Sequence, residues 1–384
     1  MKTGRITTAA GSFLTLFALT LLPWGEFKIN RVARGIPIQA MGFLGWAMWT
    51  ASIVVLLFII ALIRWKPRLF NAVLSWVFLL LPSFALILLS RFIPDGVDFD
   101  PKVARISLGI GFYLFYVGIL LLLSKAKYPK LKIFLSFLFI LVFSGSMDAL
   151  GLVREYRNIE ETFLRELSRH LTLALFSAMA AILPGILLGY AAMRYPKARE
   201  WVFGFVHVFQ VAPTLSLLAL MMIPLTALSK AFPFLADLGI KGIGFAPAFI
   251  VLFLYSLLPI TANTYAGLKQ TDPAVLENAV ALGMSPRQTL IKVWFPLTLP
   301  SIFAGIRTAM TQNIGNTILA GLVGGGGMGA LIFLGLSQSA LDLVLLGTIP
   351  VVVMALVLDA VFEVIELATV RKLGVDYDRN LRLE

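Results

Sequence analysis

Long apolar runs separated by short charged segments make up most of the sequence. An α-helix needs about 20 apolar residues to cross a hydrocarbon core of about 30 Å. About ten stretches are long enough, which predicts an all-α polytopic membrane protein. The predicted spans are residues 8–24, 41–63, 69–90, 106–123, 133–152, 171–193, 202–225, 245–268, 299–322 and 342–370.

The charged segments between these runs predict the orientation of the chain. Lys and Arg are more frequent in segments 64–68, 125–132, 194–199 and 269–292 than in the alternate segments. Cytoplasmic loops of membrane proteins carry such an excess. We therefore expect a multi-pass protein of the cytoplasmic (inner) membrane with its N-terminus in the cytoplasm. An even number of spans returns the tail, residues 371–384, to the same side.

Composition indicates that lipid is the main solvent of the chain. Hydrophobic residues make up 59% of it and charged residues 14%, against about 45–50% and about 25% in soluble proteins. The formal net charge of +12 is a feature of many nucleic-acid-binding proteins. Here the basic residues punctuate the apolar runs instead, so we expect a lipid bilayer and no nucleic acid as partner. A signal peptide is the alternative for the first run, but no small-residue cleavage site follows it.

Side chains that carry chemistry are sparse. The chain has no Cys, and its two His residues, His170 and His207, lie far apart in the sequence. We expect both to be packed or interfacial, with no metal site and no catalytic residue. The glycine run at 324–329 lacks the Lys-Ser/Thr of a phosphate-binding loop, so we expect a turn there and no cofactor in this chain.

The segment TDPAVLENAVALGMSPRQTLIKVWFPLTLP, residues 271–300, carries clear helix signals. Asp272 can cap a helix whose first position is Pro273. That helix, expected over 274–282, ends at Gly283, since glycine suits the left-handed position after a helix.

A second start signal follows in the same segment. Ser285-Pro286 resembles the first cap, and we expect Pro296 to close the second helix. Two short capped helices in one cytoplasmic loop indicate a functional element, because a passive connection needs no such specification.

The spacing of residues in this loop resembles the EAA motif of ABC importer permeases. That motif reads Glu-Ala-Ala, three residues, Gly, nine residues and Ile-x-Leu-Pro. Asn278 departs from the first Ala, and Val293 and Phe295 depart from Ile and Leu. The resemblance implies that the loop 271–296 forms coupling helices that dock on an ATPase subunit. The implied coupling residues are Glu277, Asn278, Ala279, Gly283, Val293, Phe295 and Pro296.

Further segments resemble the glycine betaine/choline/osmoprotectant branch of these permeases. They are HLTL at 170–173, QVAPTL at 210–215, the segment 258–268, AGIRTA at 304–309 and the glycine run. The resemblance implies a permease that translocates a small osmoprotectant such as glycine betaine or choline. It also implies three partners: an ATPase that binds ATP and Mg, an extracytoplasmic solute-binding protein, and a second permease subunit, identical or paralogous.

The resemblance covers roughly residues 168–370 and suggests a division of the chain. We expect an N-terminal bundle of about five spans over 1–152, a charged extracytoplasmic linker helix over 153–169, and a type I importer permease core of about five spans over 170–370. In plan, the N-terminal extension is similar to that of Yeh-type glycine betaine permeases.

Two other transporter classes stay open at this point. One is an ABC permease for another small solute, such as an amino acid or a sulfonate. The other is an ion-coupled secondary transporter, a class that usually has acidic residues near the membrane midplane. Here the acidic residues lie toward span ends; they are Asp148, Asp342, Asp359 and Glu363.

One predicted span carries a polar stripe. It begins at Arg307, which is costly inside a membrane and is therefore a candidate functional residue. Residues at helical spacing after it form one polar, small-residue face. Such a face can line a translocation path or form a tight helix–helix seam. The candidate path residues are Arg307, Thr308, Thr311, Gln312 and Asn316, with Gly315 between them.

Overall fold

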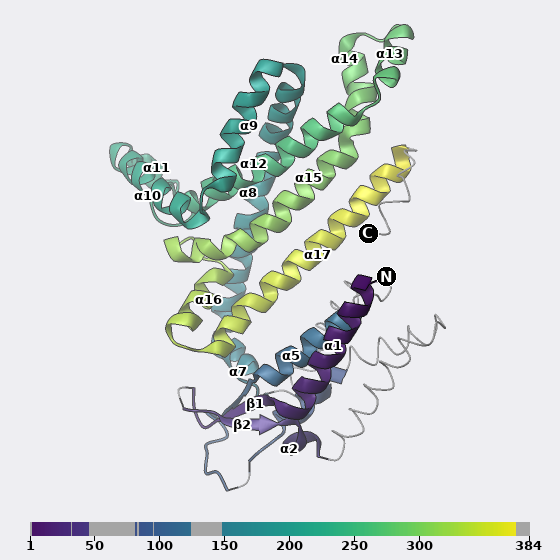
Figure 1. The fold of residues 1–384 in the computed structure, drawn as a ribbon. Coiled ribbons are helices and arrows are strands. Elements are labelled where there is room, and N and C mark those ends of the chain that lie inside the picture. The colour runs from purple at the N-terminus through teal and green to yellow at the C-terminus, as the bar shows by residue number, and fades with distance from the viewer. Residues whose placement is uncertain are drawn as a thin grey trace. The chain divides into compact units, whose positions relative to one another are not determined.

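The computed structural model of the chain describes residues 2–31, 33–45, 81–82, 84–94, 96–123 and 148–373. By their spatial contacts the residues form two compact units. Unit 1 comprises Met1–Glu160 with Gly335–Leu346, and unit 2 comprises Glu161–Leu334 with Gly347–Glu384. Figure 1 shows that helices dominate both units, which confirms the helical class. The boundaries predicted at 152 and 170 stay a prediction, because part of the predicted core lies in unit 1.

A three-stranded antiparallel sheet, which the sequence analysis did not predict, lies in unit 1. It has the order β2-β1-β3. β1 (Pro23–Lys28) pairs with β2 (Ile36–Gln39) on one side and with β3 (Arg105–Leu108) on the other. The helices α2 (Ala40–Leu44) and α7 (Gly151–Asn158) also belong to this unit, as do α1 and α5.

Two helices of unit 1 have other bounds than the spans predicted for them. α1 (Lys2–Leu21) ends before Pro23, and α5 (Ile110–Leu123) starts only after β3. The predicted spans 8–24 and 106–123 therefore lose one end each to a strand. At Pro23 the reason is the proline, which cannot donate the next helical hydrogen bond.

The core of unit 1 forms where α1 and α5 meet the sheet. A Cβ at Gly118 would lie 2.8 Å from the backbone nitrogen of Thr15, so a glycine is needed for this close helix approach. Trp24 and Phe115 are almost fully buried, with ring centroids 4.6 Å apart.

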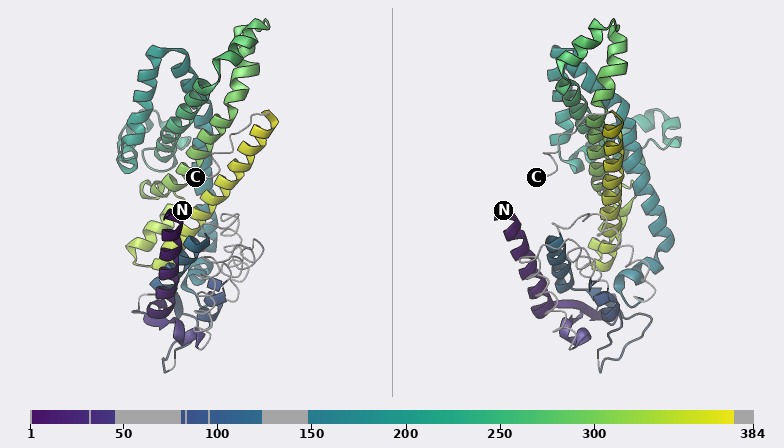
Figure 2. Two further views of the ribbon diagram at one scale, coloured as in Figure 1. Left: turned by 45° about the vertical axis from the view of Figure 1, so that its right-hand side comes forward. Right: turned by 90° about the vertical axis from the view of Figure 1, so that its right-hand side faces the viewer.

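Unit 2 consists of helices, several of which are long (Figures 1 and 2). α12 packs closely against α15: a Cβ at Gly305 would lie 2.8 Å from the Pro259 carbonyl oxygen. The elements are α8 (Glu160–Arg194), α9 (Pro196–Val211), α10 (Thr214–Ala231), α11 (Pro233–Asp237), α12 (Phe245–Gln270), α13 (Pro273–Ala281), α14 (Pro286–Thr289), a π-helical turn (Leu290–Trp294), α15 (Phe295–Asn316), a 3-10 segment (Thr317–Val323), α16 (Met328–Ser337) and α17 (Leu341–Leu373).

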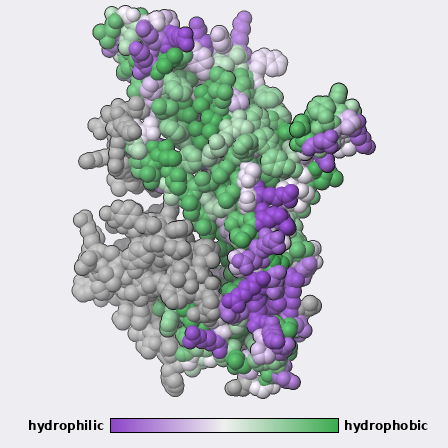
Figure 3. Space-filling model, turned by 180° about the vertical axis from the view of Figure 1, so that it is seen from behind, coloured by the Kyte–Doolittle hydropathy of each residue, from purple (hydrophilic) through white to green (hydrophobic). Residues whose placement is uncertain are grey.

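Five helical segments of the described residues are long and apolar enough to cross a membrane. In Figure 3 the surface formed by these helices is largely hydrophobic. Hydrophilic residues gather at the tip formed by α13 and α14. The predicted spans 41–63, 69–90 and 133–152 lie largely outside the described residues. The five segments are Glu160–Arg194, Thr214–Ala231, Phe245–Gln270, Pro286–Val323 and Leu341–Thr369.

The predicted single span at 202–225 is wrong. α9 ends at Val211, and α10 begins at Thr214. Ala212 takes an extended conformation with ψ of 135°, because a residue before proline is disfavoured in the α region. Pro213 therefore divides one continuous apolar run into two helices.

The predicted linker helix at 153–169 is also divided. α7 ends at Asn158, and Ile159 has the non-helical angles φ −132° and ψ 26°. α8 starts at Glu160 and continues without a break to Arg194. The second half of the charged segment therefore forms the first turns of a membrane-length helix.

Candidate functional site: the loop between α12 and α15

Two short helices shape the loop that links α12 to α15. Thr271 adopts an extended conformation that ends α12. The Asp272 side chain accepts a hydrogen bond from the backbone N–H of Ala274 at 2.9 Å. Pro273 fills the first position of α13, where no N–H is needed. The predicted start of this helix is thereby confirmed.

The turn after α13 depends on a glycine. Gly283 has a φ of +81°, in the left-handed region that residues with a Cβ rarely adopt. Its N–H donates to the Val280 carbonyl at 2.9 Å, and the N–H of Met284 donates to the Ala279 carbonyl at 3.1 Å. Two carbonyls at the helix end are thus satisfied, and the predicted end of the helix is confirmed.

A reciprocal cap starts α14. The Ser285 hydroxyl accepts from the N–H of Gln288 at 3.3 Å, and the Gln288 side-chain oxygen accepts from the N–H of Ser285 at 2.8 Å. This capping box satisfies two N–H groups that a helix start would leave unpaired. The expected second start signal at Ser285-Pro286 is confirmed.

The second helix does not end at Pro296, contrary to the prediction. The π-helical turn Leu290–Trp294 joins α14 directly to α15, and Pro296 lies in the first turn of α15. A proline ring inside an α-helix clashes with the carbonyl four residues earlier. The π turn inserts its extra residue just before Pro296 and relieves this conflict. α14 and α15 therefore form one continuous helical segment.

The base of the loop is fastened to α12. The Trp294 indole N–H donates to the Leu268 carbonyl at 2.9 Å, and the Thr298 hydroxyl donates to the Trp294 carbonyl at 2.8 Å. Leu268 lies in the last turn of α12. Beyond this base, α13 and α14 extend past the ends of α12 and α15 (Figure 2).

The tip of the loop exposes apolar side chains. Val280 is 61% exposed and Leu282 81% exposed. They lie near an open hollow of about 450 Å³ that contains the side chain of Glu277 in its wall. Apolar side chains around a hollow, with a carboxylate at its edge, suit a protein partner. The hollow is lined by Leu276, Glu277, Val280, Ala281 and Thr289.

The residues predicted for coupling fall into two groups. Glu277, Asn278 and Gly283 are exposed at the tip, whereas Ala279 is buried beneath them. The remaining three lie at the base of the loop, where the π turn passes into α15, and are Val293, Phe295 and Pro296.

Arg307 on α15 is surrounded by carboxylates of α17. Its guanidinium contacts Asp359 at 2.5 Å, Glu366 at 3.5 Å and Glu363 at 3.6 Å. The three acids are spaced four and three residues apart, which places them on one helix face. Asp359 and Glu363 were noted as acidic residues near span ends, but their pairing with Arg307 was not predicted. The arginine therefore joins α15 to α17.

The polar stripe beyond Arg307 is open on part of its length. Thr308 is exposed, and its hydroxyl donates to the Ala304 carbonyl of its own helix at 2.9 Å. Gly315 is exposed as well, and an added Cβ there would meet no described atom within 4 Å. The described helices of this chain do not form a tight seam at Gly315. The other stripe residues are half-buried; they are Thr311, Gln312 and Asn316.

Asn313, which was not among the predicted site residues, lies fully buried at the centre of unit 2. Its side-chain amide donates to the hydroxyls of Ser177 at 2.9 Å and Ser256 at 2.8 Å. It also lies 3.3 Å from the Leu252 carbonyl and 3.5 Å from the Ala174 carbonyl. One side chain thus links α8, α12 and α15. Helical spacing places Asn313 on the face opposite the polar stripe, and this position was the sequence signal for its burial.

The glycine run forms a turn that is held by α8. The N–H of Gly327 donates to the Glu166 carboxylate at 2.7 Å, and the N–H of Met328 donates to His170 Nδ1 at 3.2 Å. His170 Nε2 lies 3.0 Å from the Ile314 carbonyl. The expected turn and the expected packing of His170 are confirmed. Within the described part of the chain, no group of three His, Asp or Glu side chains could hold a metal ion.

Comparison with known families identifies two matching regions. Residues 181–371 match the family described as "Binding-protein-dependent transport system inner membrane component". Residues 5–153 match the "ABC transporter permease YehY, N-terminal domain".

Several curated proteins are similar to the second half of the chain. The choline transport system permease protein OpuBB of Bacillus subtilis is 36% identical over 51% of this chain and 83% of its own length. The glycine betaine/carnitine/choline transport system permease protein OpuCB of the same organism is 36% identical over 53% and 86%. The osmoprotectant import permease protein OsmW of Salmonella typhimurium is 37% identical over 50% and 84%.

Solved structures similar to this chain include an inward-facing MetNI methionine ABC transporter. Its sequence identity is 18% and its TM-score 0.49, over 55% of this chain and 98% of that one.

Proposed function

Because the chain belongs to the family of binding-protein-dependent transport system inner membrane components, the permeases of ABC importers, we propose that it translocates a small quaternary ammonium osmoprotectant, such as glycine betaine or choline. The observation that carries this proposal is 36% identity to permeases named for choline and for glycine betaine, carnitine and choline, over 83% and 86% of their lengths. ATP hydrolysis belongs to a separate subunit, and a solute-binding protein delivers the substrate. The chain is a multi-pass protein of the inner membrane with both termini in the cytoplasm.

Reconstitution tests this function. The chain is inserted into proteoliposomes with its ATPase and its binding protein, and uptake of labelled glycine betaine, choline, carnitine and an ordinary amino acid is measured. We expect uptake of a quaternary ammonium solute only when ATP is present on the ATPase side. Uptake driven by a proton or sodium gradient without ATP would contradict the ABC assignment, and uptake of the amino acid alone would contradict the substrate class.

The tip of the loop 271–296 is the docking surface for the ATPase in this proposal. Val280 and Leu282 supply apolar contact area there, and Glu277 supplies a charge at the rim of the hollow. Gly283, with its left-handed φ, sets the direction of the turn that follows α13.

Movement of the tip has a direct route into the spans. α14 passes through the π turn into α15 without an intervening loop, and Trp294 ties the same point to the end of α12. Arg307 lies twelve residues beyond Phe295, about 18 Å along the helix. Closure of the ATPases would thus move α12 and α15 and, through the Arg307–Asp359 ion pair, exert a force on α17.

The open stripe on α15 fits one wall of the translocation path, with a second permease subunit as the other wall. Thr308 and Gly315 are exposed and have no helix of this chain packed over them in the described residues. Because the natural chain has no Cys, Thr308→Cys gives a single thiol. We expect a water-soluble maleimide to label it, and saturating loaded binding protein with ATP to change the labelling rate. A thiol that reacts only with lipid-soluble reagents would exclude the path role.

A further inference from the structure

The connection between α16 and α17 lies in unit 1, although by sequence it belongs to the permease core. Residues 335–346 fall inside the family match at 181–371, yet their contacts place them with the N-terminal residues. A tight turn makes the connection: Ser339 has a φ of +52°, and the N–H of Ala340 donates to the Gly335 carbonyl at 2.8 Å. α17 then begins with Asp342 in its first turn.

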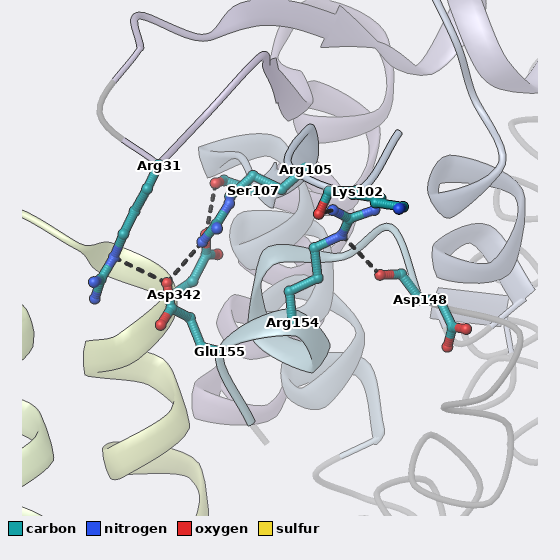
Figure 4. A network of polar contacts seen from close by, with 8 residues as sticks. All are labelled: Arg31, Lys102, Arg105, Ser107, Asp148, Arg154, Glu155 and Asp342. Atoms are coloured by element: carbon teal, nitrogen blue, oxygen red, sulfur yellow. Dashed lines mark hydrogen bonds and ion pairs between the residues drawn. The ribbon is translucent and has the colours of Figure 1, made fainter. Parts of the chain in front are cut away.

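Asp342 occupies a closely fitted cradle in unit 1, shown in Figure 4. The Ser107 hydroxyl donates to Asp342 Oδ2 at 2.8 Å. Both side chains are buried, Asp342 at 7% exposure and Ser107 at 3%. A Cβ at Gly151 would lie 2.1 Å from the same carboxylate oxygen. Only a glycine at the start of α7 leaves room for this aspartate.

The walls of the cradle are themselves fixed. Ser107 lies in β3, opposite Glu26 of β1 in the sheet. β3 is joined to the start of α7 by the hydrogen bond from the N–H of Ile106 to the Ala149 carbonyl at 2.8 Å. One turn into α7, Glu155 accepts from Arg105 of β3 at 2.7 Å and pairs with Arg31 at 3.0 Å, as Figure 4 shows. Because these contacts fix the walls of the cradle, the Asp342 side chain is held in a defined position.

The helix held by this cradle is the one that pairs with α15. Asp359 lies seventeen residues after Asp342 on the same helix, α17. It forms the ion pair with Arg307 described above. α17 is therefore fixed by polar contacts at its first turn and again where it meets the helix that continues from the coupling loop.

We propose that unit 1 positions the first turn of α17 through the Ser107–Asp342 hydrogen bond, and that this hydrogen bond keeps ATP hydrolysis coupled to transport. If α17 is fixed at one end, movement of α15 changes the position of α15 relative to α17 in the core. If that end is free, α17 follows α15, and hydrolysis proceeds without moving substrate. Asp342 is thus a positioning residue, and the inference rests on the proposed ABC function.

The test uses the complete complex of permease, ATPase and binding protein in proteoliposomes. The quantity measured is the number of substrate molecules imported per ATP hydrolysed, together with the amount of inserted permease. Ser107→Ala removes the donor, and Asp342→Ala removes the acceptor. Gly151→Ala places a methyl group where the carboxylate lies while Asp342 itself is retained. Asp342→Asn keeps an acceptor oxygen of the same shape. Asp148→Asn is the matched control, because Asp148 is half-exposed and pairs with Arg157.

We expect the three disrupting variants to lower the substrate-per-ATP ratio about five- to tenfold, at the low end of ordinary coupling between sites. Asp342→Asn should retain most of the ratio, and the control all of it. Ser107→Ala combined with Asp342→Ala should lower it no further than either change alone, because both remove one interaction.

Two results would overturn the inference. If uptake falls only in proportion to the amount of inserted permease, with an unchanged substrate-per-ATP ratio, the cradle serves folding alone. If the double variant shows the product of the two single effects, the residues act separately. Absence of ATP-driven uptake in the unmodified complex would instead contradict the proposed function, and so the two failures are distinguishable.

Discussion

In the loop between α12 and α15, the hydrogen bonds that shape the chain join residues a few positions apart, whereas around Asp342 they join residues far apart in the sequence. Asp272 caps its own helix two residues on, and Ser285 and Gln288 cap each other. Ser107 and Asp342 are 235 positions apart, and both are buried. The tip of the loop is exposed, whereas the Ser107 and Asp342 side chains of the cradle are buried.

The two arrangements have different consequences for a change in the sequence. An exposed element that forms its own caps keeps its shape when a partner docks or leaves, because no buried group loses its hydrogen bond. A buried polar contact cannot be rearranged without leaving an unpaired group, which is costly. We therefore expect substitutions in the loop to remove transport from a well-folded protein, and substitutions at buried polar contacts to change stability or coupling.

The largest effect should follow from Gly283→Val. A β-branched residue at a φ of +81° would be strained by about 1–3 kcal/mol. The turn would relax, and α13 would point elsewhere. We expect ATP-driven uptake to fall by about five- to 150-fold, since 1.4 kcal/mol corresponds to a factor of ten, while the amount of inserted protein stays normal.

Gly239 offers a matched control for this substitution. It also has a φ of +81°, and an added Cβ there would likewise meet no described atom within 4 Å. Gly239→Val imposes the same strain in the turn after α11. Equal loss of uptake in both variants would show that backbone strain, and not the direction of α13, is responsible.

A smaller effect on uptake, but the largest on stability, is expected for Asn313→Ala. The change removes the amide that the Ser177 and Ser256 hydroxyls contact inside unit 2. We expect a loss of about 1–3 kcal/mol, seen as a lower thermal unfolding temperature of the purified protein in detergent, with uptake per folded molecule largely kept. Asn316→Ala, at a half-buried position on the same helix, should leave the unfolding temperature unchanged. An equal decrease for both would contradict the importance of the buried site.

The smallest effect is expected for Ser285→Ala. Loss of an N-cap costs about 1 kcal/mol, and here it would fray only α14, since the π turn and α15 continue beyond it. We expect at most about a fivefold decrease in uptake, together with faster hydrogen exchange of the amides at 287–289. Ser285→Thr keeps a capping hydroxyl and should restore both. Unchanged exchange in Ser285→Ala would mean that docking contacts, not the cap, hold α14.

The sequence was a sound guide wherever the determining contacts are local. Asp272, Pro273 and Gly283 define α13 within one short stretch, and its start and end are as predicted. Pro213 carried a usable signal, but the apolar run around it was continuous, and its hydropathy outweighed the proline. Pro296 gave a misleading signal for a helix end, because the π turn that accommodates this proline has no sequence signature.

Contacts between distant residues could not be predicted in the same way. Nothing near Arg307 indicates that Asp359, 52 positions away, is its partner. Helical spacing places Asn313 opposite the polar stripe, but nothing near it in the sequence indicates that the Ser177 and Ser256 hydroxyls are its partners. The cradle at Asp342 needs a sheet, and its strand β3 lies at the start of an apolar run, 106–123, whose hydropathy resembles that of a membrane helix.

The most direct test of the central claim, that the tip of the loop 271–296 docks on a separate ATPase, is a cross-linking measurement. The natural chain has no Cys, so Leu282→Cys and Leu238→Cys each introduce a single thiol, at positions that are 81% and 71% exposed. Each thiol is labelled with a photoactivatable benzophenone maleimide and illuminated in the assembled complex. We predict that the probe at 282 cross-links to the ATPase and that the probe at 238, beside α11, does not. No ATPase adduct from 282, or equal adducts from both positions, would contradict the account.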